Sequence, residues 1–167
     1  MITNICIVGL LEKYTKKVAK RVADALEMFY ADVNELLSYD FIDIIEAENI
    51  VGKDYILKQE TNKIKTLSSY ENTVITLDYK SLNNEKNLKF LKQGSIIIYL
   101  KLNKPEYKIK LADEKLKKDE ADLALKMFVE RDKVLKGYSN IVVLANGTIT
   151  SVVKTILNKI EEYYEKR

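Results

Sequence analysis

Short apolar runs alternate with segments of helical periodicity along the chain. The runs have the aliphatic, β-branched composition of buried strands and cover residues 5–10, 29–33, 73–77, 95–100 and 141–144. Between them the apolar spacing predicts amphipathic helices over residues 15–28, 34–49 with a break, 52–67, 88–94, 119–137 and 149–160. This alternation predicts an α/β fold, a three-layer α/β/α sandwich with a five-stranded parallel sheet. Ligands of such sheets bind beyond the carboxyl ends of the strands, here just after residues 8, 31, 77, 100 and 144.

Residues 101–120 differ in character from the segments around them. They contain the only proline, Pro105, and seven lysines against five acidic residues, with scattered apolar positions. This composition predicts a mobile connection or lid that becomes helical near Asp119. The helix predicted over residues 88–94 is expected to stop at Gly94, which we interpret as a C′ glycine.

The composition limits the possible classes of function. The 167 residues, 47% of them hydrophobic, predict a single domain spanning residues 1–167. A net charge of +3, from 28 basic and 25 acidic residues, is too balanced for a dedicated nucleic-acid binder. The chain has no histidine, so Ser-His-Asp chemistry is excluded and we predict no metal site.

The surroundings of the chain can also be predicted. Cys6 is the only cysteine and lies within an apolar run, which predicts a core residue in a reducing compartment. No apolar stretch is long enough for a membrane span, and the N-terminus lacks the layout of a signal peptide. We therefore expect a cytoplasmic location and no membrane partner.

The first strand runs into Gly9 and then into a helix, which is the strand–loop–helix arrangement of a phosphate-binding P-loop. The working motif is G-x-x-x-x-G-K-[ST], whereas the residues from Gly9 onward read G-L-L-E-K-Y-T-K. Tyr14 stands in place of the second glycine, Thr15 in place of the lysine and Lys16 in place of the hydroxyl residue. Thr15 is most simply the N-cap of the helix.

The order and spacing of these elements resemble the shikimate kinase family of P-loop small-molecule kinases over nearly the whole chain. The family's sequence motifs align with 9–16 (phosphate loop), 32–34 (D-x-D), 52–60 (G-E-x-x-F-R-x-x-E), 78–80 (triple glycine), 99–100 (Y-L before the lid) and 131–135 (R-x-P-x-Y). The resemblance implies a P-loop kinase fold and ATP- and Mg²⁺-dependent phosphorylation of shikimate.

The chain departs from the family in the residues that carry this chemistry. Glu12 and Tyr14 stand where glycines let the loop adopt φ > 0 and aim its N–H groups at phosphate. A side chain in that conformation costs roughly 1–2 kcal/mol. Leu57 replaces a substrate-binding arginine, and Asp78-Tyr79-Lys80 replaces the triple glycine. We therefore expect a degenerate phosphate loop, consisting of Gly9, Glu12, Tyr14, Thr15 and Lys16.

Three residues remain as candidates for binding substrate. Asp32 and Asn34 occupy the D-x-D position, and Arg131 is the one arginine near the expected site. A guanidinium group can hold a carboxylate in two parallel hydrogen bonds. Ordinary alternatives remain for two of them: Asp32 as a helix cap and Arg131 in a solvated ion pair.

Three functions follow from this pattern. The favoured hypothesis is a catalytically silent relative of shikimate kinase that binds no cofactor and acts as a regulatory or binding module. Its partner would be a protein or a small hydroxy acid such as shikimate. The alternative is a divergent active shikimate kinase that uses ATP and Mg²⁺ and folds Lys13 or Lys16 into the loop. A nucleic-acid binder, suggested only by the lysines of the first helix and the lid, is disfavoured.

Overall fold

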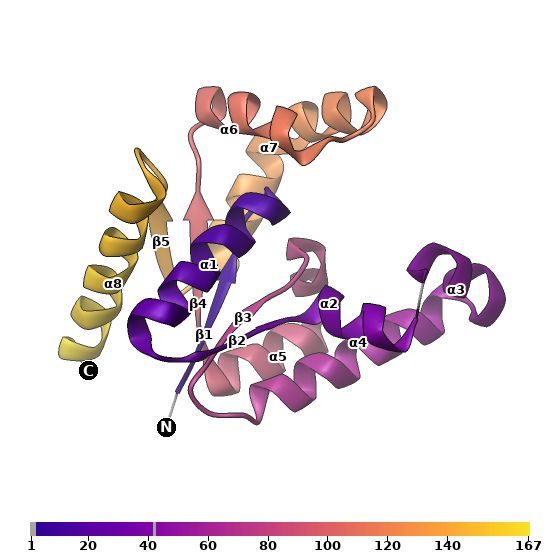
Figure 1. The fold of residues 1–167 in the computed structure, drawn as a ribbon, viewed down its shortest axis with the longest axis horizontal. Coiled ribbons are helices and arrows are strands. Elements are labelled where there is room, and N and C mark those ends of the chain that lie inside the picture. Colours follow the sequence, from indigo (N-terminus) through magenta and orange to yellow (C-terminus); the bar gives the residue numbers. More distant parts are fainter. Residues whose placement is uncertain (1–2, 42) are drawn as a thin grey trace.

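The computed structural model describes residues 3–41 and 43–167. These residues form five parallel strands in the order β2-β3-β1-β4-β5, with β1 (Asn4–Val8) at the centre of the sheet (Figure 1). The others are β2 (Phe29–Asp32), β3 (Thr73–Thr76), β4 (Ser95–Lys101) and β5 (Ile141–Leu144). All five strands were predicted from the sequence. The sheet aligns Ile5 of β1 with Val74 of β3 and Ile96 of β4.

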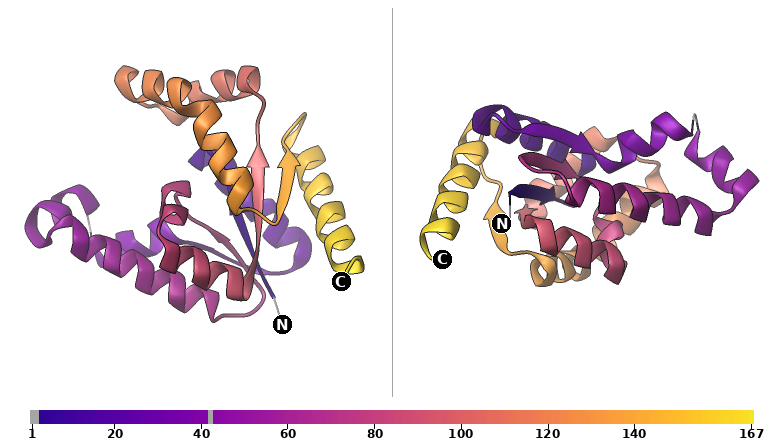
Figure 2. Two further views of the ribbon diagram at one scale, coloured as in Figure 1. Left: turned by 180° about the vertical axis from the view of Figure 1, so that it is seen from behind. Right: turned by 90° about the horizontal axis from the view of Figure 1, so that it is seen from below.

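Helices cover both faces of the sheet, which confirms the predicted three-layer sandwich (Figure 1, Figure 2). Alternate residues of β1 point to opposite faces, so Ile5 and Ile7 pack with α1 (Glu12–Leu26) and α8 (Ile149–Glu165). Cys6 and Val8 pack in a second core with α4 (Lys53–Ser68) and α5 (Glu85–Gly94). Cys6 is fully buried, as predicted, and burial raises the pKa of its thiol to about 12.

The edge strand β5 is less buried than its sequence suggested. Ile141 and Val143 face the core, whereas Val142 is 40% and Leu144 46% exposed. The prediction of a strand was right, but the prediction that it is buried on both faces was wrong. Val142 and Leu144 are exposed because α8 covers only one face of this edge strand (Figure 1).

The segment between β2 and β3 is helical with breaks, as predicted. It contains α2 (Val33–Asp40), α3 (Ile44–Val51) and α4, and Gly52 separates the last two with φ 90°. Ile42, which falls in the predicted broken helix, lies outside the described residues. The region around α3 projects away from the sheet (Figure 1, Figure 2).

The predicted lid has more helix than its composition suggested. It forms α6 (Lys104–Leu111) and a 3₁₀ turn, η2 (Ala112–Glu114), before α7 (Lys118–Tyr138) begins. The prediction that helix starts only near Asp119 was wrong. The reason is an N-terminal signal: the Asn103 side chain accepts a hydrogen bond from the Glu106 N–H, and Pro105 lies in the first turn.

Gly94 has a different role from the one predicted. It is the last residue of α5 rather than a C′ residue, and its φ is not positive. A Cβ at this position would collide with the carbonyl oxygen of Ser68 at the end of α4. Glycine is therefore needed for the close approach of two helices. Among the described helices, none combines the length and the apolar character needed to cross a bilayer.

Candidate functional site

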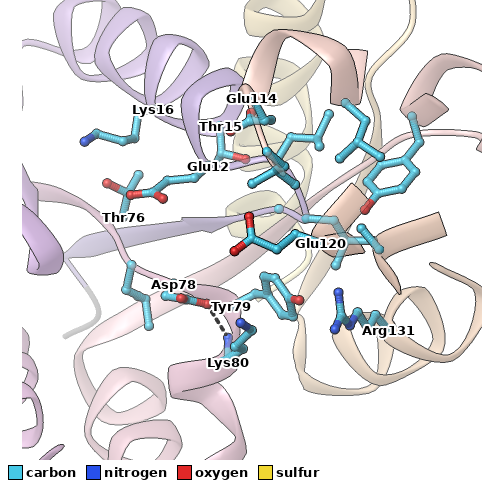
Figure 3. Close-up of a pocket in the computed structure, with 18 of the residues that line it drawn as sticks. Glu12, Thr15, Lys16, Thr76, Asp78, Tyr79, Lys80, Glu114, Glu120 and Arg131 are labelled. Atoms are coloured by element: carbon cyan, nitrogen blue, oxygen red, sulfur yellow. Dashed lines mark hydrogen bonds between the residues drawn. The ribbon is translucent and has the colours of Figure 1, made fainter. Parts of the chain in front are cut away.

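A cavity of about 330 Å³ lies beyond the carboxyl ends of β1, β2 and β3, under the lid (Figure 3). Its volume is in the range of small-molecule sites. The walls come from the β1–α1 turn, the ends of β2 and β3, the 3₁₀ turn η1 (Tyr79–Asn83), the lid and α7. Its charged lining residues are Glu12, Lys16, Asp32, Asp78, Lys80, Glu114, Glu120 and Arg131.

The turn between β1 and α1 is short. Only Gly9, Leu10 and Leu11 separate the strand from the helix, so Glu12 and Tyr14 are helical. The Thr15 N–H donates to the carbonyl of Leu11 (2.9 Å), and Thr15 is buried inside the first turn. The prediction that Thr15 caps the helix was therefore wrong.

Gly9 packs directly against that first turn. A Cβ on Gly9 would collide with Oγ1 of Thr15 and would lie 3.5 Å from the carbonyl oxygen of Leu100. Gly9 does not adopt a positive φ. In this structure the glycine is required for close packing between the turn and the helix.

The lid contacts the N-terminus of α1 through a carboxylate. The Lys13 N–H donates to both Glu114 oxygens, at 3.1 and 3.3 Å, and Glu114 lies beside Glu12 and Thr15 (Figure 3). The first N–H groups of a helix lack partners within the helix and favour negative charge. Glu114 thus supplies an anion from the chain itself.

Lys16 forms ion pairs at the same end of the cavity. Its Nζ lies 2.6 Å from Oε1 of Glu35 and 3.9 Å from Oδ1 of Asp32. Burial lowers the pKa of Lys16, but the hydrogen bond to Glu35 and the charges of Asp32 and Glu35 outweigh it and leave the pKa raised. The ammonium is thus stabilised in its charged form against two carboxylates.

Asp32 is a buried structural carboxylate as well as a lining residue. It caps α2 by accepting the Glu35 N–H (2.9 Å), and its other oxygen accepts the Thr76 hydroxyl (2.6 Å). The capping alternative for Asp32 therefore holds. Asn34 lies half-buried on α2 and is not among the described residues that line the cavity.

Arg131 lines the opposite end of the cavity. Its guanidinium lies 5.6 Å from the ring centre of Tyr79, and no carboxylate of residues 3–41 or 43–167 lies within ion-pair distance of it. Burial raises the pKa of Tyr79, and the charge of Arg131 partly offsets this effect. The neighbouring Asp132 instead accepts the Tyr99 hydroxyl (2.7 Å) and pairs with Lys101 and Lys136.

Comparison with known proteins assigns the family. Residues 16–161 match the family model described as shikimate kinase. The chain belongs to the shikimate kinase family. It is 25% identical over 168 residues to the shikimate kinase of Sulfurihydrogenibium sp. (strain YO3AOP1), covering 98% of this chain and 96% of that protein. A shikimate kinase of Alkaliphilus oremlandii (strain OhILAs) is 28% identical over 101 residues, 60% of each chain.

Solved shikimate kinase structures share the fold. The Bacteroides thetaiotaomicron protein has a TM-score of 0.81 at 16% identity, covering 96% of this chain and 99% of that one. The Acinetobacter baumannii protein, solved in complex with shikimate, has a TM-score of 0.81 at 20% identity, with 97% and 94% covered. The Aquifex aeolicus protein has a TM-score of 0.76 at 22% identity, with 96% and 97% covered. At these identities the likeness shows the fold alone.

Sequence reasoning missed part of this shikimate kinase-like site. Glu114 contacts a residue 101 positions away in the chain, and nothing in its local sequence indicates that contact. Tyr107 and Glu120 also line the cavity from the lid and α7. The asparagine and proline at 103 and 105 were the signal that could have placed Tyr107 on a helix over the cavity.

Proposed function

We propose that this member of the shikimate kinase family is a non-catalytic binding module for a small hydroxy acid such as shikimate. In this proposal it transfers no phosphate. The observation that carries the proposal is the Glu114 carboxylate at the N-terminus of α1, the place to which the family motif brings the phosphates of the nucleotide.

The residues present do not fit a nucleotide at this end. Glu12 stands at a glycine position of the motif and Thr15 at the lysine position, and the Glu114 carboxylate accepts the Lys13 N–H at the start of α1 (Figure 3). A phosphate would meet like charges in place of N–H donors and an ammonium.

The residues do not fit a nucleotide-bound magnesium ion either. In P-loop enzymes the ion is held by a loop hydroxyl and an aspartate. Here Lys16 replaces the hydroxyl residue, and its ammonium lies 3.9 Å from Asp32 and 2.6 Å from Glu35. A divalent cation at Asp32 would be repelled by that ammonium unless Lys16 left its two partners.

The Arg131 end of the cavity supports recognition of an acid. The guanidinium lines the cavity and lies against the Tyr79 ring, and no carboxylate of the described residues is within ion-pair distance of it. An incoming carboxylate could therefore form a bidentate pair without displacing an internal one. The shikimate complex of the Acinetobacter baumannii protein makes shikimate the first acid to test.

A thermal-shift panel tests the proposal. Shikimate at 100 times its Kd should stabilise the protein by about 2.7 kcal/mol, whereas ADP or ATP with Mg²⁺ at millimolar concentration should give no shift. Arg131→Ala should remove the shikimate shift, and Lys133→Ala, which changes an exposed basic residue two positions away, should retain it. A shift in Arg131→Ala equal to that of the wild type would contradict the role of Arg131.

A divergent active kinase is the second candidate. The similarity to a shikimate kinase over 98% of the chain and the presence of Asp32 and Arg131 in the cavity favour it. It would require Lys13 or Lys16 to move toward the phosphates. Magnesium-dependent stabilisation by ADP, or phosphate transfer from ATP to shikimate, would establish this candidate in place of the binding module.

A further inference from the structure

We propose that Glu114 is an intramolecular ligand that holds residues 104–117 of the lid closed over the cavity in the ligand-free protein. The inference rests on the proposed function, because it assigns the N-terminus of α1 to an internal carboxylate. It concerns the ligand-free protein and can be tested without substrate.

The first support is the geometry of the contact itself. One backbone N–H lies within hydrogen-bond distance of both oxygens of Glu114, and α1 is fifteen residues long, so its N-terminal N–H groups carry the full effect of the helix dipole. Hydrogen bonds to an ionised acceptor are roughly twice as strong as neutral ones. The contact joins the end of the lid to the core of the fold.

The second support is an independent contact one residue further along α1. The Nζ of Lys110, on α6, lies 4.8 Å from the ring centre of Tyr14. Burial, with a further contribution from Glu106 of α6, raises the pKa of the Tyr14 hydroxyl. Lys13 and Tyr14 thus both meet the lid, and Tyr14 occupies a glycine position of the family motif.

The lid is also held by apolar contacts that do not involve Glu114. Tyr107 and Leu111 of α6 are buried, and the Tyr107 ring lies 4.6 Å from that of Phe128 on α7. Directly after Glu114, Lys115 adopts a left-handed conformation with φ 53°, which is uncommon for a residue other than glycine. The chain therefore turns sharply where the carboxylate reaches α1.

Amide hydrogen exchange of the full, ligand-free chain tests the inference. In Glu114→Ala, the Lys13 amide should exchange roughly three- to tenfold faster than in the wild type, as expected for loss of a solvent-exposed hydrogen bond. The amides of residues 104–117 should accelerate with it. Glu114→Gln should fall between the two, because its side chain keeps a neutral acceptor.

The matched control is Asp113→Ala. Asp113 is the neighbouring acidic residue, is exposed, and has no hydrogen bond or ion pair within the described part of the chain, so its loss should leave lid exchange unchanged. The amides of β1 and β4 report whether each variant retains its fold. Equal exchange at Lys13 and across the lid in wild type, Glu114→Gln and Glu114→Ala would overturn the inference.

The experiments distinguish a failure of the Glu114 contact from a failure of the non-catalytic binding module. If Glu114→Ala leaves exchange unchanged while ADP and Mg²⁺ still give no thermal shift, the lid contact is wrong and the binding module stands. If ADP and Mg²⁺ stabilise the wild type, the non-catalytic function is wrong. Faster lid exchange in Glu114→Ala would then still support Glu114 as the ligand-free contact.

Discussion

The two ends of the cavity differ in what their charged groups already contact. At the α1 end, Glu114 binds a helix N–H and Lys16 pairs with Glu35 and Asp32. At the α7 end, Arg131 has an aromatic neighbour and no carboxylate among the described residues. Both ends carry charge, but of the two cations Lys16 and Arg131 only Arg131 could receive a carboxylate without first losing an ion pair. The difference indicates that charged side chains in a cavity do not by themselves make it a binding site.

The physical reason lies in what a ligand must displace. Asp32 is 3% exposed and accepts two hydrogen bonds, so removing its partners would leave a buried carboxylate uncompensated, which is strongly unfavourable. A group that binds at the α1 end must therefore replace these contacts as well as form its own. A carboxylate that binds Arg131 has no internal ion pair to break first, because the contact of this guanidinium is with the Tyr79 ring.

The largest effect on stability is expected at the α1 end. Asp32→Ala removes a helix cap and a buried, charge-assisted hydrogen bond to Thr76, and should lower the free energy of unfolding by roughly 2–4 kcal/mol. Asp43→Ala is the matched control, because Asp43 caps the exposed helix α3 by accepting two backbone N–H groups; it should cost about 1 kcal/mol. Urea denaturation measures both, and equal losses would mean that Asp32 is an ordinary cap.

Gly9→Ala should give the next largest effect. The new Cβ would collide with Oγ1 of Thr15, and overpacking of this kind costs roughly 1–3 kcal/mol. Adding Thr15→Ala removes that atom and leaves the Thr15 Cβ position 3.6 Å away, an ordinary contact. In thermal unfolding the double variant should therefore recover most of the loss relative to Thr15→Ala alone. Failure to recover would contradict a packing role for Gly9.

The fold was largely predictable from the sequence, because its strands and helices carry strong local signals. The runs around Cys6 and Ile97 are buried on both faces, and such runs read as parallel strands without further information. The errors occurred where the environment is set by the rest of the molecule. The exposure of Val142 depends on the strand order, and Gly94 is needed because α4 ends against it.

The candidate site was only partly predictable. Asp32 could be found because it follows a recognisable strand, and Arg131 because the resemblance to the family implies a motif at that position; both line the cavity. The contact between Glu114 and Lys13 could not be found, since it joins the lid to a helix 101 residues earlier through a backbone N–H. The ordinary capping role of Asp32 was foreseen, whereas Thr15 was predicted as the cap at the start of a helix that in fact begins at Glu12.

At the open end of the cavity, Arg131→Ala should change stability little. The side chain has no ion pair among the described residues, and a cation–π contact such as that with Tyr79 contributes about 0.5–1 kcal/mol. Urea denaturation should thus show a loss well below that of Asp32→Ala. A loss of several kcal/mol would mean that Arg131 is held as tightly as the residues at the α1 end, and the contrast between the two ends would disappear.

The smallest expected effect depends on pH. The hydrogen bond to Lys16 lowers the pKa of Glu35 below its ordinary value of 4.5, so this pair stabilises the fold at neutral pH and the contribution is lost as the pH falls below about 4.5. Glu35 is 46% exposed, and exposed pairs contribute about 0.2–1 kcal/mol. Glu35→Gln should therefore reduce stability slightly at pH 7 and hardly at pH 3, as urea denaturation can measure. Glu46→Gln is the control, because Glu46 occupies the same third position of a capped helix without an ion pair in the described part of the chain. If the loss for Glu35→Gln is the same at both pH values, Asp32 alone stabilises the Lys16 ammonium and the ion pair with Glu35 contributes nothing.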